Sequence, residues 1–229
     1  MGNISNYEKE MYQYLVDPIV EAATQERPNK EHESDDHYKA RLTKKIHHSF
    51  NEFKNRFKAG IKLLIQHKKW PHDDRFKKAE KLMQNHVEWD KEMSQGHTLQ
   101  EILKFTDQEL TTFYTEGWES HQRGAHEDAS HIFLFLTQLN PKVGAFWSAL
   151  GAAEEKLGDI KSAMQAYILA SELETETLSP YLHGAKCLLL LNKIDKAKAT
   201  LQRAIERAEK EPNLNEYKSI AEQMLKAIE

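Results

Sequence analysis

Residues that cross-link a chain or interrupt its helices are scarce in this sequence. The 229 residues include one cysteine, Cys187, so an internal disulfide framework is excluded and a reducing compartment is indicated. Only 9 glycines and 6 prolines are present, which favours helical structure. No apolar run approaches the roughly 18 residues of a membrane span, so we expect no stable membrane insertion.

Signals for secretion or lipid attachment are also absent. The N-terminus is polar and lacks the apolar core of a secretory signal, and Asn6 stands where the myristoylation pattern has Ser or Thr. With 30% charged and 39% hydrophobic residues, the composition is typical of a soluble helical protein. We therefore expect a cytoplasmic location.

Motifs for catalysis and metal binding are missing as well. The sequence has no glycine-rich phosphate loop, no nucleophile elbow and no paired metal ligands. Its 12 histidines include the adjacent His47 and His48, which cannot both face one side of a helix, and no pair has a recognised zinc spacing. We expect no enzyme, no cofactor and no metal site, and interpret the histidines as solvated or half-buried.

The first 95 residues are predicted to form a helical N-terminal extension. Apolar residues recur at helical spacing over residues 4–24, but Pro18 lies within this stretch, which predicts a kink or a break near Asp17. The polar residues 25–36 are predicted to be a linker.

A basic helical hairpin over about residues 38–94 is expected to complete the extension. A narrow, heptad-like apolar stripe runs from Ile46 to Leu64, and apolar residues over 76–93 predict a second helix returning along the first. Residues 38–81 hold 14 Lys or Arg against 4 Asp or Glu, although the whole chain has a formal net charge of −4. The stripe is suited either to a homodimer or to closing on residues 76–93 within one chain.

A 34-residue period organises residues 110–209, within a predicted second domain over residues 96–229. Residues of matching character recur at this step in three successive segments: Gly117, Gly151 and Ala185; Phe113, Trp147 and Tyr181; Ala129, Ala163 and Ala197; Phe133, Tyr167 and Leu201; Leu136, Ala170 and Ala204. This period and order are typical of tetratricopeptide repeats, each of which is a helix, a turn and a second helix. The predicted fold is therefore all-α: a superhelix of three repeats, with a capping helix over residues 214–228.

Local signals agree with these helix boundaries. Thr98-Leu-Gln-Glu101 and Thr106-Asp-Gln-Glu109 both match the capping box, which predicts a helix start at each. Gly124, Gly158 and Asn192 stand at the predicted turns within the repeats, where the left-handed conformation that ends a helix suits glycine or asparagine.

Several short sequence segments in and just before the repeats resemble those of a known family. They are Thr98–Leu103 leading into Leu110–Tyr114, Gly124–Ala129, Phe146–Ala152 and Tyr181–Leu188. Through them the segment from about residue 98 to 208 resembles the class II chaperones of bacterial type III secretion, the LcrH/SycD-like family. The resemblance implies a bacterial cytoplasmic protein whose three repeats hold hydrophobic translocator subunits soluble and unassembled before export.

This chain departs from the family pattern in two respects. Nearly a hundred residues precede the family-like segment, where such chaperones usually carry a short N-terminal helix. In addition, His121 and His126 stand where the family tends to have aromatic residues.

The first helix of each repeat is expected to line a concave groove that binds a peptide. The inward positions predicted to contact this peptide are Tyr114, Trp118, His121, Ala145, Ser148, Ala152, Glu155, Leu182, Lys186 and Leu189. Tyr114 and Trp118 are the expected anchors, because rigid aromatic side chains contribute most at such sites. Trp147 and Tyr181 are expected in the core. The alternative for the groove is that the N-terminal region fills it.

Taken together, these features predict a type III secretion chaperone that binds secreted hydrophobic translocator proteins through an extended peptide segment. The alternative is a tetratricopeptide adaptor that joins folded proteins, with the basic N-terminal helices docking to an acidic partner or a membrane surface. Nucleic acid is not expected as a partner, because the phenylalanines among the lysines fall on the apolar stripe and are needed for packing.

Overall fold

A computed structural model describes residues 17–25, 34–66, 73–84, 95–173 and 177–228. All regular structure in these ranges is helical, which confirms the predicted all-α fold. The chain divides into two compact units, one made of residues 1–58 and 73–97 and the other of residues 59–72 and 98–229. No helix in the described ranges is long and apolar enough to cross a membrane.

The first unit contains α2 (Asp17–Gln25), most of α3 (Asp35–Gln66) and α4 (Asp74–Gln84). Helix α2 begins at Asp17 and has Pro18 in its first turn, where proline is tolerated, and the kink or break expected near Asp17 stays a prediction. Residues 1–16 lie outside the described residues. Val20 packs against Leu42, Ile46 and Phe50, which joins α2 to α3.

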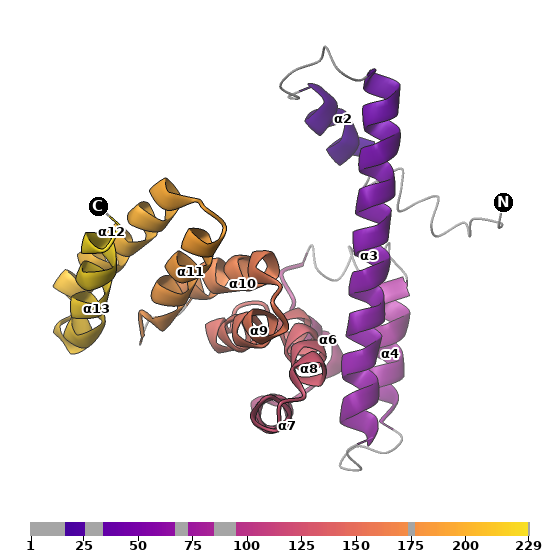
Figure 1. The fold of residues 1–229 in the computed structure, drawn as a ribbon. Coiled ribbons are helices and arrows are strands. Elements are labelled where there is room, and N and C mark those ends of the chain that lie inside the picture. The colour runs from indigo at the N-terminus through magenta and orange to yellow at the C-terminus, as the bar shows by residue number, and fades with distance from the viewer. Residues whose placement is uncertain (1–16, 26–33, 67–72, 85–94, 174–176, 229) are drawn as a thin grey trace. The chain divides into compact units, whose positions relative to one another are not determined.

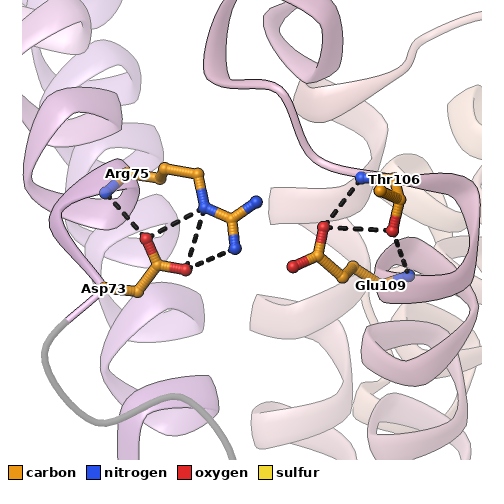
Figure 2. Close-up of polar contacts among 4 residues, drawn as sticks. All are labelled: Asp73, Arg75, Thr106 and Glu109. Carbon is orange, nitrogen blue, oxygen red and sulfur yellow. Dashed lines mark hydrogen bonds and ion pairs between the residues drawn. The ribbon is translucent and has the colours of Figure 1, made fainter.

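Helix α4 begins with a local polar contact. The carboxylate of Asp73 accepts a hydrogen bond from the backbone N–H of Arg75 at 2.9 Å (Figure 2). It also forms an ion pair with the guanidinium group of Arg75 at 2.6 Å. Phe76, Ala79 and Leu82 of α4 are buried. The predicted return helix thus includes α4, while residues 85–94 lie outside the described residues. The hairpin and the division of the chain at residue 95 stay predictions.

The second unit holds the repeats. Its helices follow one another as stacked pairs, shown from magenta to yellow in Figure 1; from α7 onward each helix packs against the next along the chain, and the short α6 contacts α8. They are α6 (Leu99–Leu103), α7 (Asp107–Gln122), α8 (His126–Leu139), α9 (Gly144–Leu157), α10 (Ile160–Leu173), α11 (Ser179–Leu190), α12 (Ile194–Lys210), the 3₁₀ turn η2 (Pro212–Leu214) and α13 (Asn215–Lys226).

The predicted helix starts and stops are confirmed. At α7, Glu109 N donates to Thr106 Oγ1 at 3.2 Å and Thr106 N donates to the Glu109 carboxylate at 2.8 Å, which forms the capping box (Figure 2). The same reciprocal pair opens α6 at Thr98. Gly124, Gly158 and Asn192 have φ angles of 81°, 80° and 55°, in the left-handed region that ends a helix.

The small residues of the repeat pattern allow the two helices of a repeat to approach closely. A Cβ atom on Gly151 would lie 2.8 Å from the ring of Tyr167, so no larger residue fits between α9 and α10. Tyr181 is buried, as expected, and so is Phe113 at the matching position of the first repeat.

The interpretation of Trp147 as a core residue is wrong. Trp147 is only half-buried, and its Nε1 donates a hydrogen bond to the carbonyl of Pro141 at 2.9 Å. The neighbouring Phe146 is buried in its place. An indole N–H needs a hydrogen-bond partner when it leaves water, and the link between the repeats supplies one at the edge of the core.

Both ends of the repeat array are covered. Leu214 and Ala221 are buried against α11 and α12, with Tyr217, Met224 and Leu225 packed around them, which confirms the capping role of α13. At the other end, Gly60 in the last part of α3 lies against the backbone of α8, since a Cβ on Gly60 would overlap the carbonyl oxygen of His131. This contact is on α8, the second helix of the first repeat.

Candidate peptide-binding groove

All ten predicted contact residues are accessible in the structure. They lie on α7, α9 and α11, the first helices of the three repeats; Lys186 is exposed and the other nine are half-buried. The opposite sides of these helices hold buried residues such as Phe113, Ala149 and Ala185. We use the name candidate groove for the ten residues together. Whether a peptide binds there stays a prediction.

Tyr114 and Trp118 form the aromatic end of the candidate groove. Their ring centroids are 6.2 Å apart in an edge-to-face arrangement. The Tyr114 ring also lies 5.7 Å from Phe133 and 5.8 Å from Phe146, and Trp118 lies 5.7 Å from Phe133. Because Phe133 and Phe146 are buried, they hold the two accessible rings in fixed orientations.

His121 extends this aromatic end and meets a second histidine. Its ring lies edge-on to Trp118, with centroids 5.2 Å apart, and its Nδ1 is 3.3 Å from the Nδ1 of His126. Burial, together with His126 and the positive charge of Lys156, lowers the pKa of His121. The pair therefore favours the uncharged form of His121, which suits an apolar ligand.

Glu155 is the centre of a polar cluster that joins the second and third repeats. Its carboxylate accepts hydrogen bonds from Lys186 Nζ at 2.6 Å and from the Tyr167 hydroxyl at 3.1 Å. His183 Nδ1 lies 3.4 Å from the same carboxylate. Burial alone would raise the pKa of Glu155, but Lys186, Tyr167 and His183 together hold it below its usual range. Glu155 is therefore ionised at neutral pH.

The structure brings only some of the predicted residues together. Tyr114, Trp118 and His121 form one cluster and Glu155 and Lys186 form another. Ala145, Ser148 and Ala152 lie on α9 between them in the repeat order, where small side chains leave room for a ligand. Leu182 packs partly against the buried cluster of α11 and α12, so it is not fully available to a ligand.

Four residues that contact the candidate groove were not among the predicted contact residues: Phe146, His126, Tyr167 and His183. His183 lies three residues before Lys186 on α11, so helical spacing alone could have indicated it. His126 and Tyr167 lie on second helices, α8 and α10, and reach the first helices only through the packing of the pairs.

A shallow cavity occurs elsewhere, over α10, α11 and α12. Its volume is ≈ 250 Å³, and none of the ten predicted residues lines it. The lining residues are Ile168, Ser171, Leu188, Lys196, Ala199, Thr200 and Arg203.

Comparisons with known proteins point to one class, the chaperones of type III secretion. No protein-family model matches the chain. The chain is 26% identical over 133 residues to the Low calcium response locus protein H of Yersinia pseudotuberculosis serotype I, which covers 58% of this chain and 79% of the relative.

Solved structures give the same result. The chain is similar to a type III secretion complex from Aeromonas hydrophila, at 26% identity and a TM-score of 0.57, with 62% of this chain and 95% of that one covered. It is also similar to PcrH in complex with the chaperone-binding region of PopD, at 27% identity and a TM-score of 0.50, with 54% and 93% covered. The repeat part of the chain thus resembles the class II type III secretion chaperones, as its motifs predict.

Proposed function

We propose that this protein is a type III secretion chaperone. In this proposal the candidate groove binds an extended apolar segment of a secreted translocator protein and keeps that protein soluble and unassembled before export. The accessible rings of Tyr114 and Trp118 carry the proposal. Accessible aromatic side chains that buried rings hold rigid lose little conformational entropy when a ligand covers them, which favours binding.

The relatives support the same role. The structure of PcrH holds the chaperone-binding region of a second protein, PopD. The mechanism proposed for the present chain is binding alone, in the cytoplasm of a bacterium and without catalysis. Covering apolar segments of the client prevents their aggregation, because the buried surface is no longer available to other copies.

Co-expression tests the proposal. Candidate translocators from the same organism are produced alone, with the wild-type protein, and with the variant Tyr114→Ala plus Trp118→Ala, and the soluble fraction of each translocator is measured. We expect at least one translocator that is insoluble alone, soluble with the wild type and insoluble with the variant.

A matched control removes two exposed apolar residues from a second helix instead. Ile168 and Leu169 of α10 are 38% and 45% exposed and lie outside the candidate groove, so Ile168→Ala plus Leu169→Ala should still solubilise the translocator. Circular dichroism is used to check that both variants are folded. If the wild type solubilises no translocator, the proposed function is wrong.

An adaptor that joins folded proteins is the second candidate. Helix α3 exposes Lys44, Lys45 and Lys62, which offer positive charge to an acidic partner or a membrane surface. The state of the partners separates the two functions. The client of a chaperone is insoluble alone, whereas each partner of an adaptor is soluble without it.

A further inference from the structure

The middle of the candidate groove has an uneven distribution of charge. The carboxylate of Glu155 lies low, with 18% of its side chain exposed. The groups that surround it reach further out, since the side chains of His183 and Lys186 are 46% and 54% exposed. A ligand that enters here therefore meets hydrogen-bond donors and positive charge before it meets the anion.

Lys186 has hydrogen-bond donors to spare. It has three ammonium hydrogens and uses one toward Glu155 at 2.6 Å. His183 directs Nδ1 toward the carboxylate of Glu155, so in the neutral ring the hydrogen lies on Nδ1 and Nε2 is an acceptor. The remaining ammonium hydrogens of Lys186 and its partly shielded positive charge suit a carboxylate, which accepts hydrogen bonds.

The buried ring of Tyr167 fixes the position of the His183 ring. The His183 ring stacks on Tyr167, with centroids 5.1 Å apart and 23° between the planes. Tyr167 is itself only 3% exposed and is held against Gly151 of α9. Glu155, Tyr167 and His183 thus come from α9, α10 and α11, and the packing of these helices sets where the imidazole lies.

Apolar and small groups flank the polar cluster along the candidate groove. Ala152 lies one helical turn before Glu155 on α9, and Leu182 and Leu189 lie on either side of Lys186 in α11. A bound segment would therefore place a charged side chain between apolar ones.

We propose that Lys186 binds an acidic side chain of the client, with Glu155 as the positioning residue that holds its ammonium group. The inference rests on the proposed function, because it names the chemistry of the segment that the candidate groove takes. It predicts a binding motif in which one Asp or Glu is flanked by apolar residues.

A random peptide library displayed on phage tests the motif without knowledge of the client. Three proteins are used as bait: the wild type, Lys186→Met and, as a control, Lys161→Met, which removes an exposed lysine at the start of α10. We expect the wild type and the control to enrich apolar peptides with an Asp or Glu at a fixed position. Lys186→Met should enrich apolar peptides without that preference.

Synthetic peptides then measure the effect. Replacing the enriched Asp or Glu by Asn or Gln should weaken binding to the wild type about fivefold and leave binding to Lys186→Met unchanged. A charge exchange gives a second test, since Lys186→Glu should prefer the peptide with lysine at the same position.

The outcomes separate this inference from the function on which it rests. Enrichment of apolar peptides with no acidic preference, or an equal loss of binding in wild type and Lys186→Met, overturns the carboxylate site and leaves the groove in place. Enrichment of no peptide by the folded wild type overturns both.

Discussion

Gly117 and Phe133 are in such close contact that a Cβ atom built on Gly117 would lie 2.5 Å from Cε1 of the Phe133 ring. Phe133 is fully buried and also contacts Tyr114 and Trp118, so the ring has no free space into which it can move. This contact sets the distance between α7 and α8 and also supports the aromatic end of the candidate groove.

Gly117→Ala should destabilise the protein although alanine is the better helix former. The added methyl group overpacks the contact, and we expect the free energy of unfolding to fall by about 1–3 kcal/mol. Gly184→Ala is the control, because its Cβ would meet Tyr167 Cβ at an ordinary 3.6 Å. That variant should be unchanged or more stable by up to about 1 kcal/mol. Urea denaturation measures both, and equal stability of the two variants would contradict the prediction.

Glu155→Gln should weaken the contact between the second and third repeats in a pH-dependent way. The pKa of Glu155 is lowered below 4.5 in the folded protein, so its stabilising contribution is fully present above the pKa of the unfolded chain and is lost as the pH falls through the folded pKa. The melting temperature of the variant should therefore lie below that of the wild type at pH 7, and the two should converge toward pH 3.

A glutamate on α7 provides the comparison. Glu119 is exposed, and its backbone carbonyl, which accepts from Arg123 N, is unaffected by a change of side chain. Glu119→Gln should give nearly the same melting curve as the wild type at both pH values. If the difference in melting temperature between the wild type and Glu155→Gln does not become smaller at acid pH, the ion pair is not the cause of that difference.

Acid should also destabilise the protein through His121. Its pKa is lowered below 6.5 by burial, by His126 and by Lys156, so below about pH 6.5 the unfolded chain takes up a proton before the folded chain does. The contribution of the uncharged His121 to the free energy of unfolding is thus fully present above the pKa of the unfolded chain and is lost as the pH falls. Histidine resonances followed by NMR between pH 5 and 8 give the titration directly.

Removal of a neighbouring charge should raise the pKa of His121. Lys156→Met eliminates one of the charges that lower it, whereas Lys161→Met changes an exposed lysine that is not among its causes. The titration of His121 should move upward in the first variant and stay in place in the second. An unchanged midpoint in Lys156→Met would refute the proposed electrostatic cause.

Gly60→Val should separate the last part of α3 from α8. The carbonyl of His131 is part of the backbone of α8 and cannot turn away as a side chain can, so we expect a loss of about 1–3 kcal/mol in stability. Hydrogen exchange of the α8 amides near His131 should become faster. Ala59→Val, at the adjacent half-buried position, is the control and should leave this exchange unchanged.

The repeat fold was predictable from the sequence because local chemistry determines it. A capping box needs only Thr106 and Glu109 on one helical turn, and a left-handed helix end needs only a residue such as Gly158 or Asn192. The 34-residue period also places a small residue opposite an aromatic one in successive repeats, Gly117 with Phe133 and then Gly151 with Tyr167. These features depend on residues close together in the chain or at a fixed step along it.

The tertiary structure alone decided which side chains meet in the candidate groove. The period assigns Tyr114 and Glu155 to inward positions. It does not show that Phe146 packs against Tyr114. Nor does it show that Tyr167 and His183 contact Glu155. For the same reason Phe146 rather than Trp147 is buried. Such contacts depend on the rotation and spacing of helices from different repeats, which the packing of whole side chains fixes and a pattern of residue types does not.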